Sequence, residues 1–260
     1  MRYKMDKFIL LFLIMVTFMT NAEESDNLAV GWELWYPYQY HNKNDELTGM
    51  DIEIFNLISS QARWSITYLE LPWKRHLQLV KDGMVNLAMG TSPSEEREQY
   101  AYFSKPYRNE TVNLFVRKGE SSKIALNNLS DLIDSTYLIG IENGYYYGET
   151  FKELNKDPEF KLRINSVIDL EQNAQRLLNK QIDGFLADPI TMKFFIEKYK
   201  LQGEFEQHAL RIYQSSIHII LSKKMHTLSD LKVINNAISA LEKNGKLNAL
   251  KEKWSKIVSH

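Results

Sequence analysis

The chain has 260 residues, no cysteine and a nearly balanced charge, with 32 basic and 33 acidic side chains. This balance gives no basic surface of the kind that binds nucleic acid. The absence of cysteine excludes disulfides and a lipid anchor on an N-terminal cysteine. A chain of this length can bury a sizeable core as one large domain or two small ones. The histidines are scattered without metal-binding spacing, so we expect no metal and no cofactor.

Residues 1–22 have the order of a secretory signal peptide. Lys4 and Lys7 precede the apolar run 8–19, and the small residue Ala22 follows it. The run is shorter than the ~20 residues that a membrane span needs. An uncleaved N-terminal anchor is the alternative interpretation. The segment therefore predicts a secreted chain.

After this segment, strand-like and helix-like stretches alternate along the chain. The predicted strands cover 28–32, 64–71, 85–90, 111–119, 136–141, 160–166, 183–187 and 215–223. The predicted helices cover 50–62, 73–83, 149–156, 169–180, 189–199 and 228–245, and a last helix carries Leu247, Leu250 and Trp254. Strands that alternate with helices of ~10–15 residues indicate α/β layers. The chain has no dinucleotide fingerprint, no P-loop and no nucleophile elbow, which leaves these routes to nucleotide binding and hydrolysis unsupported.

Arg97 follows a predicted helix start by about one turn. Ser92 fits the N-cap, Pro93 fits the first helical position and Glu95 fits the third position of a capping box. Free N–H groups at a helix N-terminus and a planar guanidinium together make a good receptor for a carboxylate. The alternative is that Glu95 fills the anion role and Arg97 is a solvated surface residue.

Aromatic residues gather directly after the first strand, in the stretch WELWYPYQY at 32–40. Ligands in α/β proteins sit at the carboxyl ends of strands, so Trp35, Tyr36 and Tyr38 could form the wall of a small-molecule pocket. The alternative is that some of these rings cover the edge of the core. Trp73, at the start of a later helix, is either a core residue or a second wall.

Six blocks occur in an order that points to a known family. They are LAVGWELWYPYQY, LTGMDIEIFNLIS, PWKRHLQLVKDGMVNLAMG, SEEREQYAYFSKPY, NKQIDGFLADPIT and VINNAISALEKNGKLNALKEKW. Through them the chain resembles the family 3 periplasmic solute-binding proteins, the polar amino acid receptors of ABC transporters. The resemblance covers Leu28 to Trp254. It implies a type II periplasmic-binding-protein fold, in which two α/β lobes with helix-flanked sheets are joined by two hinge crossings. Lobe 1 would be 27–116 plus 215–260, and lobe 2 would be 117–214.

The resemblance also implies a binding site between the lobes. Arg97 would hold the α-carboxylate of the ligand, helped by the backbone of Thr91 and Ser92. In lobe 2, Asp188 would take the ammonium group; Asp188 is also a candidate N-cap ahead of Pro189. A zwitterion would satisfy Arg97 and Asp188 together only when the cleft closes.

The loop 143–148, NGYYYG, takes the place of the family's Gly-Thr-Thr turn, so Tyr145 and Tyr146 would approach the ligand. This change removes two hydroxyls and adds bulk. Asn86 stands where the family has an acid, and the segment up to Arg97 differs in length, which leaves the register at Gly90 open. The ligand is therefore a small polar or aromatic amino-acid-like molecule whose identity stays open.

Three functions remain possible after these observations. The resemblance favours a monomeric periplasmic receptor that binds an amino acid or small carboxylate and delivers it to an ABC permease in the inner membrane. No catalytic residue is expected in that case. The second is an enzyme similar to the periplasmic cyclohexadienyl dehydratases, for which Glu33 and Glu142 are the candidate acids. The third is a stand-alone sensor that presents its ligand to a membrane receptor.

Overall fold

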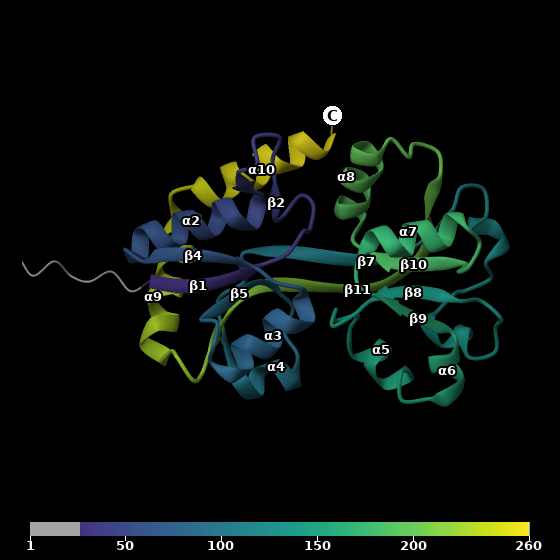
Figure 1. The fold of residues 1–260 in the computed structure, drawn as a ribbon, viewed down its shortest axis with the longest axis horizontal. Coiled ribbons are helices and arrows are strands. Elements are labelled where there is room, and N and C mark those ends of the chain that lie inside the picture. Colours follow the sequence, from purple (N-terminus) through teal and green to yellow (C-terminus); the bar gives the residue numbers. More distant parts are fainter. Residues whose placement is uncertain (1–26, 260) are drawn as a thin grey trace, which may run out of the picture.

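The computed structural model describes residues 27–259, so the predicted signal peptide lies outside the described residues. Two α/β lobes lie side by side, and two long strands, β7 (Arg108–Arg117) and β11 (Phe205–Ser222), run through both (Figure 1). The described strands form a sheet path in the order β4-β1-β5-β11-β7-β10-β8-β9, with β6 paired to β11. The predicted two-lobed α/β fold is confirmed.

Lobe 1 contains the N-terminal strands and both C-terminal helices. Its strands are β1 (Asn27–Trp32), β4 (Ser65–Glu70), β5 (Leu87–Thr91) and β6 (Ala101–Phe103), with a small hairpin of β2 (Tyr40–His41) and β3 (Leu47–Thr48). Its helices are α2 (Met50–Ala62), α3 (Trp73–Asp82), α4 (Glu95–Tyr100), α9 (Leu228–Lys243) and α10 (Lys246–Ser259). In Figure 1, α2 and α10 lie above the sheet and α3 and α4 lie below it. The predicted stripe of Ile52, Phe55 and Ile58 on α2 is buried in the core that α2 shares with α9.

Lobe 2 is built from the middle of the chain. Its strands are β8 (Ile139–Glu142), β9 (Ile164–Val167) and β10 (Gly184–Ala187) beside β7 and β11. Its helices are α5 (Glu149–Leu154), α6 (Pro158–Leu162), α7 (Leu170–Leu178) and α8 (Pro189–Tyr199), and two 3-10 turns, η1 (Ser121–Lys123) and η2 (Leu129–Leu132), precede β8. Helices α7 and α8 cover one face and α5 and α6 the other (Figure 1). Each face has its own apolar core.

The crossing between the lobes runs along the pairing of β7 with β11. Residues 113–116 of β7 pair antiparallel with β10 in lobe 2, while His218 to Ser222 of β11 pair with β5 and β6 in lobe 1. These pairings indicate that β7 passes from lobe 1 into lobe 2 before Asn113. The lobe limits given above stay a prediction.

Local rules position several helices as predicted. Asp169 caps α7 by accepting from the Gln172 N–H at 2.9 Å, and Asp188 caps α8 by accepting from the Thr191 N–H at 2.8 Å, with Pro189 following. One predicted strand is partly wrong. Residues 158–162 form α6, because Asp157 caps a helix that Pro158 begins.

The predicted helix start before Arg97 is also wrong by two residues. Helix α4 begins at Glu95, and its N-cap is Ser94, whose Oγ accepts from the Arg97 N–H at 3.3 Å. The reason is a contact with a distant part of the chain. Thr91 is still paired in the sheet, opposite His218, so the chain starts to coil only after Pro93. Arg97 therefore lies at the third helical position.

Candidate ligand-binding site

A small cavity lies between the lobes, where strands β1, β5 and β8 end. It is lined by Glu33, Trp35, Gln39, Trp73, Gly90, Ser92, Arg97, Glu110, Tyr145 and Tyr146. Most of these side chains were predicted as ligand-binding residues, and they come from both lobes. The cavity has a volume of about 10 Å³. It has room for about one water molecule, so an amino acid can enter only if the two walls separate.

Arg97 is the central cation of this cavity. It is only 7% exposed, which contradicts the alternative of a solvated surface residue. Its Nη1 donates to the Ser92 carbonyl at 2.8 Å, and its Nη2 donates to the Gly144 carbonyl of lobe 2 at 3.2 Å. The guanidinium carbon lies 5.9 Å from the centre of the Trp73 ring and 5.7 Å from that of Tyr146. Aromatic faces at this distance attract a cation. Burial lowers the pKa of Arg97.

Trp73 fits both interpretations given for it, as a core residue and as a wall of the cavity. Its ring packs partly buried against the core beneath α3, next to Leu79 and Val80, and it also lines the cavity. The ring therefore supports the Arg97 guanidinium from lobe 1, while Tyr146 approaches from lobe 2.

Trp35 connects the walls of the cleft. Its Nε1 donates to Thr191 Oγ1 of lobe 2 at 3.1 Å, and its ring meets that of Tyr145 edge-on at 5.8 Å. The ring also packs over Gly90, where an added Cβ would lie 2.6 Å from Trp35 Cζ3. Gly90 has a φ of +71°, so glycine is required there for both space and conformation.

Asp188 is buried beside the cleft but does not line the cavity. Its Oδ1 accepts from the Thr191 N–H at 2.8 Å and from the Tyr38 hydroxyl of lobe 1 at 3.3 Å. The carboxylate therefore caps α8 and contacts the opposite lobe at the same time. Burial raises its pKa.

Thr91 and Tyr36 also lie away from the cavity. Thr91 is fully buried on β5, and its Oγ1 donates to the Met89 carbonyl at 3.3 Å. Tyr36 lines a separate hollow against lobe 2, where its hydroxyl accepts a hydrogen bond from Lys198. Both residues stay predictions as ligand contacts.

The carboxyl groups of Glu33 and Glu110 also line the cavity, and that of Glu142 lies within electrostatic range of both. Glu33 accepts from the Trp73 N–H at 2.7 Å at the start of α3, and burial raises its pKa to about 7. Glu110 accepts from the Tyr145 hydroxyl at 2.5 Å, and burial raises its pKa to about 7. Burial, and then the charge of Glu33, raises the pKa of Glu142 to about 8. The site therefore combines one cation with carboxyl groups whose pKa values lie close to neutral pH.

Glu110 was missed from the sequence, and so was a second buried arginine. Arg108 forms a two-pronged ion pair with Asp51 of α2, with Nε–Oδ1 at 2.8 Å and Nη2–Oδ2 at 3.0 Å. Its guanidinium carbon lies 3.7 Å from the centre of the Tyr38 ring. Both residues lie in the polar start RNET of β7, at alternate positions directly before the apolar run VNLFV, and this alternation is the signal that could have found them.

No group of histidine, aspartate or glutamate side chains within residues 27–259 is arranged to hold a metal ion. In the same part of the chain, no helix has the length and apolar character needed to cross a bilayer.

Comparisons with known proteins agree with this architecture. The arginine-binding extracellular protein ArtP of Bacillus subtilis is 27% identical over 95% of this chain and 96% of its own length. The L-cystine-binding protein TcyJ of Escherichia coli K12 is 23% identical over 91% of this chain and 85% of its own. An ancestral arginine-binding protein bound to arginine superimposes with a TM-score of 0.75 at 20% identity, over 88% of this chain and 97% of that one, which shows the shared fold.

The relatives named here bind different amino acids, so their names do not select a ligand for this chain. The family model for bacterial extracellular solute-binding proteins, family 3, matches residues 28–257. The match spans both lobes and the two strands that join them. The chain belongs to the bacterial extracellular solute-binding proteins, family 3.

Proposed function

We propose that this protein is a periplasmic receptor that captures an amino-acid-like solute between its lobes and delivers it to an ABC importer. The observation that supports this most is the state of Arg97. Its guanidinium is buried, and its hydrogen bonds go to two backbone carbonyls, Ser92 and Gly144, instead of to a carboxylate. A buried cation without an ionic partner is unfavourable, so a ligand carboxylate at Arg97 would supply what the site lacks.

The acids of the site restrict the class of ligand. A simple anion would meet the carboxyl groups of Glu33 and Glu110, which line the same cavity as Arg97. A zwitterion would instead place its ammonium group toward them and ionise them. We therefore infer an amino acid, or a related molecule with both a carboxylate and a cationic group. The rings of Trp35 and Tyr145 would cover its body.

Closure is the physical basis of this proposal. The cavity walls come from both lobes, so a bound solute contacts both only when the lobes meet. Charge-assisted hydrogen bonds are worth roughly 1.5–3 kcal/mol each. Three or four of them, with aromatic burial, reach about the −8 kcal/mol of a micromolar binder after ordering costs. All of these groups lie in one chain, so a monomer can act alone.

A thermal-shift screen of amino acids and small carboxylates tests the proposal. The correct ligand at a hundredfold excess over its Kd should raise the melting temperature by roughly 5–10 °C. Arg97→Ala should abolish the shift, and Arg75→Ala, which removes an exposed arginine from α3, should keep it. A full shift in the Arg97→Ala protein would remove Arg97 from the site.

The importer is the less supported half of the proposal, because a sensor would bind its solute in the same way. Uptake of the identified ligand by cells, measured with and without this protein, separates the two. Loss of uptake in cells that lack the protein supports delivery to a permease. Unchanged uptake, together with a lost transcriptional response to the ligand, would favour the sensor.

A dehydratase-like activity is a second candidate, favoured by one observation. The raised pKa of Glu142, about 8, keeps this carboxyl protonated at neutral pH, as a general acid for a leaving hydroxyl must be. Incubation with prephenate or arogenate tests it. Formation of an aromatic product that Glu142→Gln abolishes would support the enzyme, and no product with either compound would exclude this activity.

A further inference from the structure

A series of buried contacts joins the two lobes outside the cleft cavity. Asp51 of α2 holds Arg108, at the start of β7, through the two-pronged ion pair. The guanidinium carbon of Arg108 lies 3.7 Å from the centre of the Tyr38 ring. The Tyr38 hydroxyl donates to Asp188 Oδ1, at the start of α8, at 3.3 Å. All four residues are at most 5% exposed, so the series connects α2 of lobe 1 with α8 of lobe 2 through the interior.

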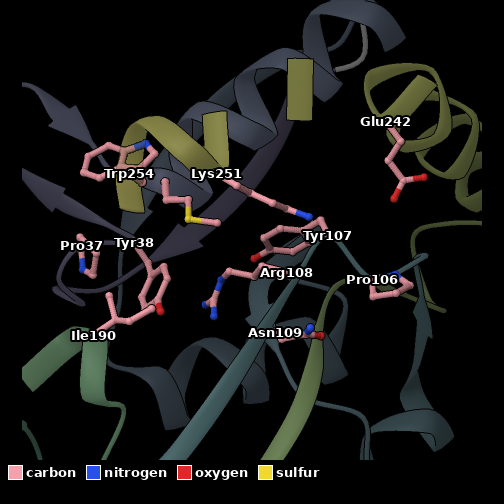
Figure 2. Close-up of a pocket in the computed structure, with 11 residues that line it drawn as sticks. Pro37, Tyr38, Pro106, Tyr107, Arg108, Asn109, Ile190, Glu242, Lys251 and Trp254 are labelled. Carbon is pink, nitrogen blue, oxygen red and sulfur yellow. The ribbon is translucent and has the colours of Figure 1, made fainter. Parts of the chain in front are cut away.

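These contacts lie apart from the place proposed for the solute. Tyr38 and Arg108 line a cavity of about 440 Å³ between the lobes, which shares no lining residue with the cleft cavity. In Figure 2 the Tyr38 ring lies beside the Arg108 guanidinium, and its hydroxyl points toward the helix that carries Ile190, α8. Asp188 lines neither cavity. The bond from Tyr38 to Asp188 therefore joins the lobes without forming part of the cavity beside Arg97.

Two neighbouring contacts join the same loop to α8. Thr191 Oγ1 accepts from Trp35 Nε1 at 3.1 Å. Lys198 donates to the Tyr36 hydroxyl, and its Nζ lies 4.1 Å from the centre of the Tyr36 ring. Thr191 and Lys198 follow the N-cap of α8 by three and ten residues, spacings that place them on one side of the helix together with the cap. One face of α8 therefore meets the loop 35–38 along its length.

The donor and the acceptor of the buried bond are each held in place within their own lobe. The Asp188 carboxylate accepts from the Thr191 N–H at 2.8 Å, which fixes it at the N-terminus of α8. The Tyr38 ring packs against Arg108, which Asp51 holds. Closure therefore has to order neither side chain, and the bond forms at a low entropic cost. Hydrogen bonds to charged groups are also stronger than those between neutral groups.

We propose that Tyr38 and Asp188 form a latch that draws α8 onto lobe 1, with Arg108 and Asp51 as its positioning residues. Asp188 then serves closure instead of binding the ammonium group of a solute. Rotation of lobe 2 away from lobe 1 breaks the latch. Because every member is a protein group, the latch acts whichever solute the cleft takes. A latch that populates the closed arrangement in advance raises the affinity for every solute by the same factor.

Two spin labels measure the open and closed populations without any solute. The chain has no cysteine, so Gln99→Cys on α4 and Thr150→Cys on α5 can be labelled specifically. Both residues are exposed. The ion pair of Glu95 with Lys152, at 3.9 Å, shows that these two helices approach each other across the lobes. Double electron–electron resonance gives the distribution of distances between the labels, in which we expect a closed population for the chain with an intact latch.

Tyr38→Phe keeps the ring against Arg108 and removes only the hydroxyl of the latch. The loss of a hydrogen bond to a charged group should lower the ratio of closed to open protein by about tenfold or more. Tyr68→Phe is the matched control, because the Tyr68 hydroxyl donates to Asn56 within lobe 1 at 2.8 Å. This control should leave the ratio unchanged.

Asp188→Asn tests the other partner. Asparagine still caps a helix but offers a neutral acceptor, so the ratio should fall by a smaller factor, about three- to tenfold. Added to Tyr38→Phe, the same substitution should lower the ratio no further, because the bond is already absent. Asp157→Asn is the matched control. Asp157 caps α6 in the same lobe and, like Asp188, precedes a proline, so its replacement should leave the ratio unchanged.

Two results would overturn the proposal. One is a distance distribution without a closed population when the latch is intact. The other is an unchanged distribution in either Tyr38→Phe or Asp188→Asn, because the bond between the two residues would then not hold the lobes together. Asp188 would in that case be left as a candidate solute contact. The experiment contains no solute, so its failure leaves the amino-acid thermal shift, which reports the cleft, unaffected.

Discussion

The two buried arginines near the junction of the lobes have opposite surroundings. Arg108 has a two-pronged partner in Asp51 and lies against the Tyr38 ring. Arg97 is almost as deeply buried, at 7% against 5% exposed, yet its guanidinium donates to two carbonyl oxygens, lies near aromatic rings and forms no ion pair within the described residues. A charge that the protein neutralises is part of its framework. A charge that it leaves without a counterion is available to a ligand.

The largest effect on stability is expected from a substitution that breaks the ion pair of Arg108 with Asp51. Asp51→Ala leaves Arg108 as a buried charge without a partner, which should lower the free energy of unfolding by about 3–5 kcal/mol. Denaturant unfolding followed by circular dichroism measures this. Glu53→Ala, which changes an acid on the same helix whose partner is the exposed Lys253, is the matched control and should cost less than about 1 kcal/mol. Similar losses in the two variants would contradict the framework role of Arg108.

The same measurement on Arg97→Ala should give a much smaller change. The substitution removes two hydrogen bonds but also a buried charge without a counterion, so the free energy of unfolding should change by about 1 kcal/mol or less. Ligand affinity, in contrast, should fall by about a hundredfold or more. If Arg97→Ala destabilised the chain as much as Asp51→Ala, both arginines would be structural.

The buried acids near the cleft predict a pH dependence of stability. Folding raises the pKa of Glu142 from its ordinary value of 4.5 to about 8, so the folded chain keeps a proton that the unfolded chain releases. The stability that this carboxyl contributes is full below pH 4.5 and is lost as the pH rises toward about 8. The melting temperature should therefore fall between about pH 5 and pH 8, and Glu142→Gln should flatten the slope. A melting temperature that rose across this range would contradict the burial of these acids.

The smallest effect concerns closure. Trp35→Phe keeps a ring in the cleft but loses the Nε1 hydrogen bond to Thr191 across the lobes, worth about 0.5–1.5 kcal/mol. The ligand-free protein should become more open, which small-angle X-ray scattering detects as an increased radius of gyration. Trp64→Phe, on the far side of lobe 1, should leave the radius unchanged. Equal radii for Trp35→Phe and the wild type would mean that this contact does not hold the lobes together.

Much of the fold could be predicted because its signals are local. The caps at Asp169 and Asp188 and the apolar stripe on α2 each depend on residues within one or two helical turns. The helix start before Arg97 could not be placed because Ser92 and Ser94 both fit an N-cap locally. The choice between them follows from the pairing of Thr91 with His218, far away in the sequence.

The part of the site that could be predicted also depends on local sequence signals. Arg97 and the aromatic loop lie in recognisable stretches, and the structure brings them together at one cavity. The partnership of Arg108 with Asp51, 57 residues apart, has no local signal. The position of Glu110 against Tyr145 likewise depends on how β7 meets the loop before α5. Such contacts are set by the packing of the lobes.

The most direct test is a crystal structure of the protein with the amino acid that gives the largest thermal shift. We predict that the ligand carboxylate replaces the Ser92 and Gly144 carbonyls as the partner of the Arg97 guanidinium, with the ammonium group on the side of Glu33 and Glu110. A ligand bound elsewhere, with Arg97 still bonded to both carbonyls, would contradict the account.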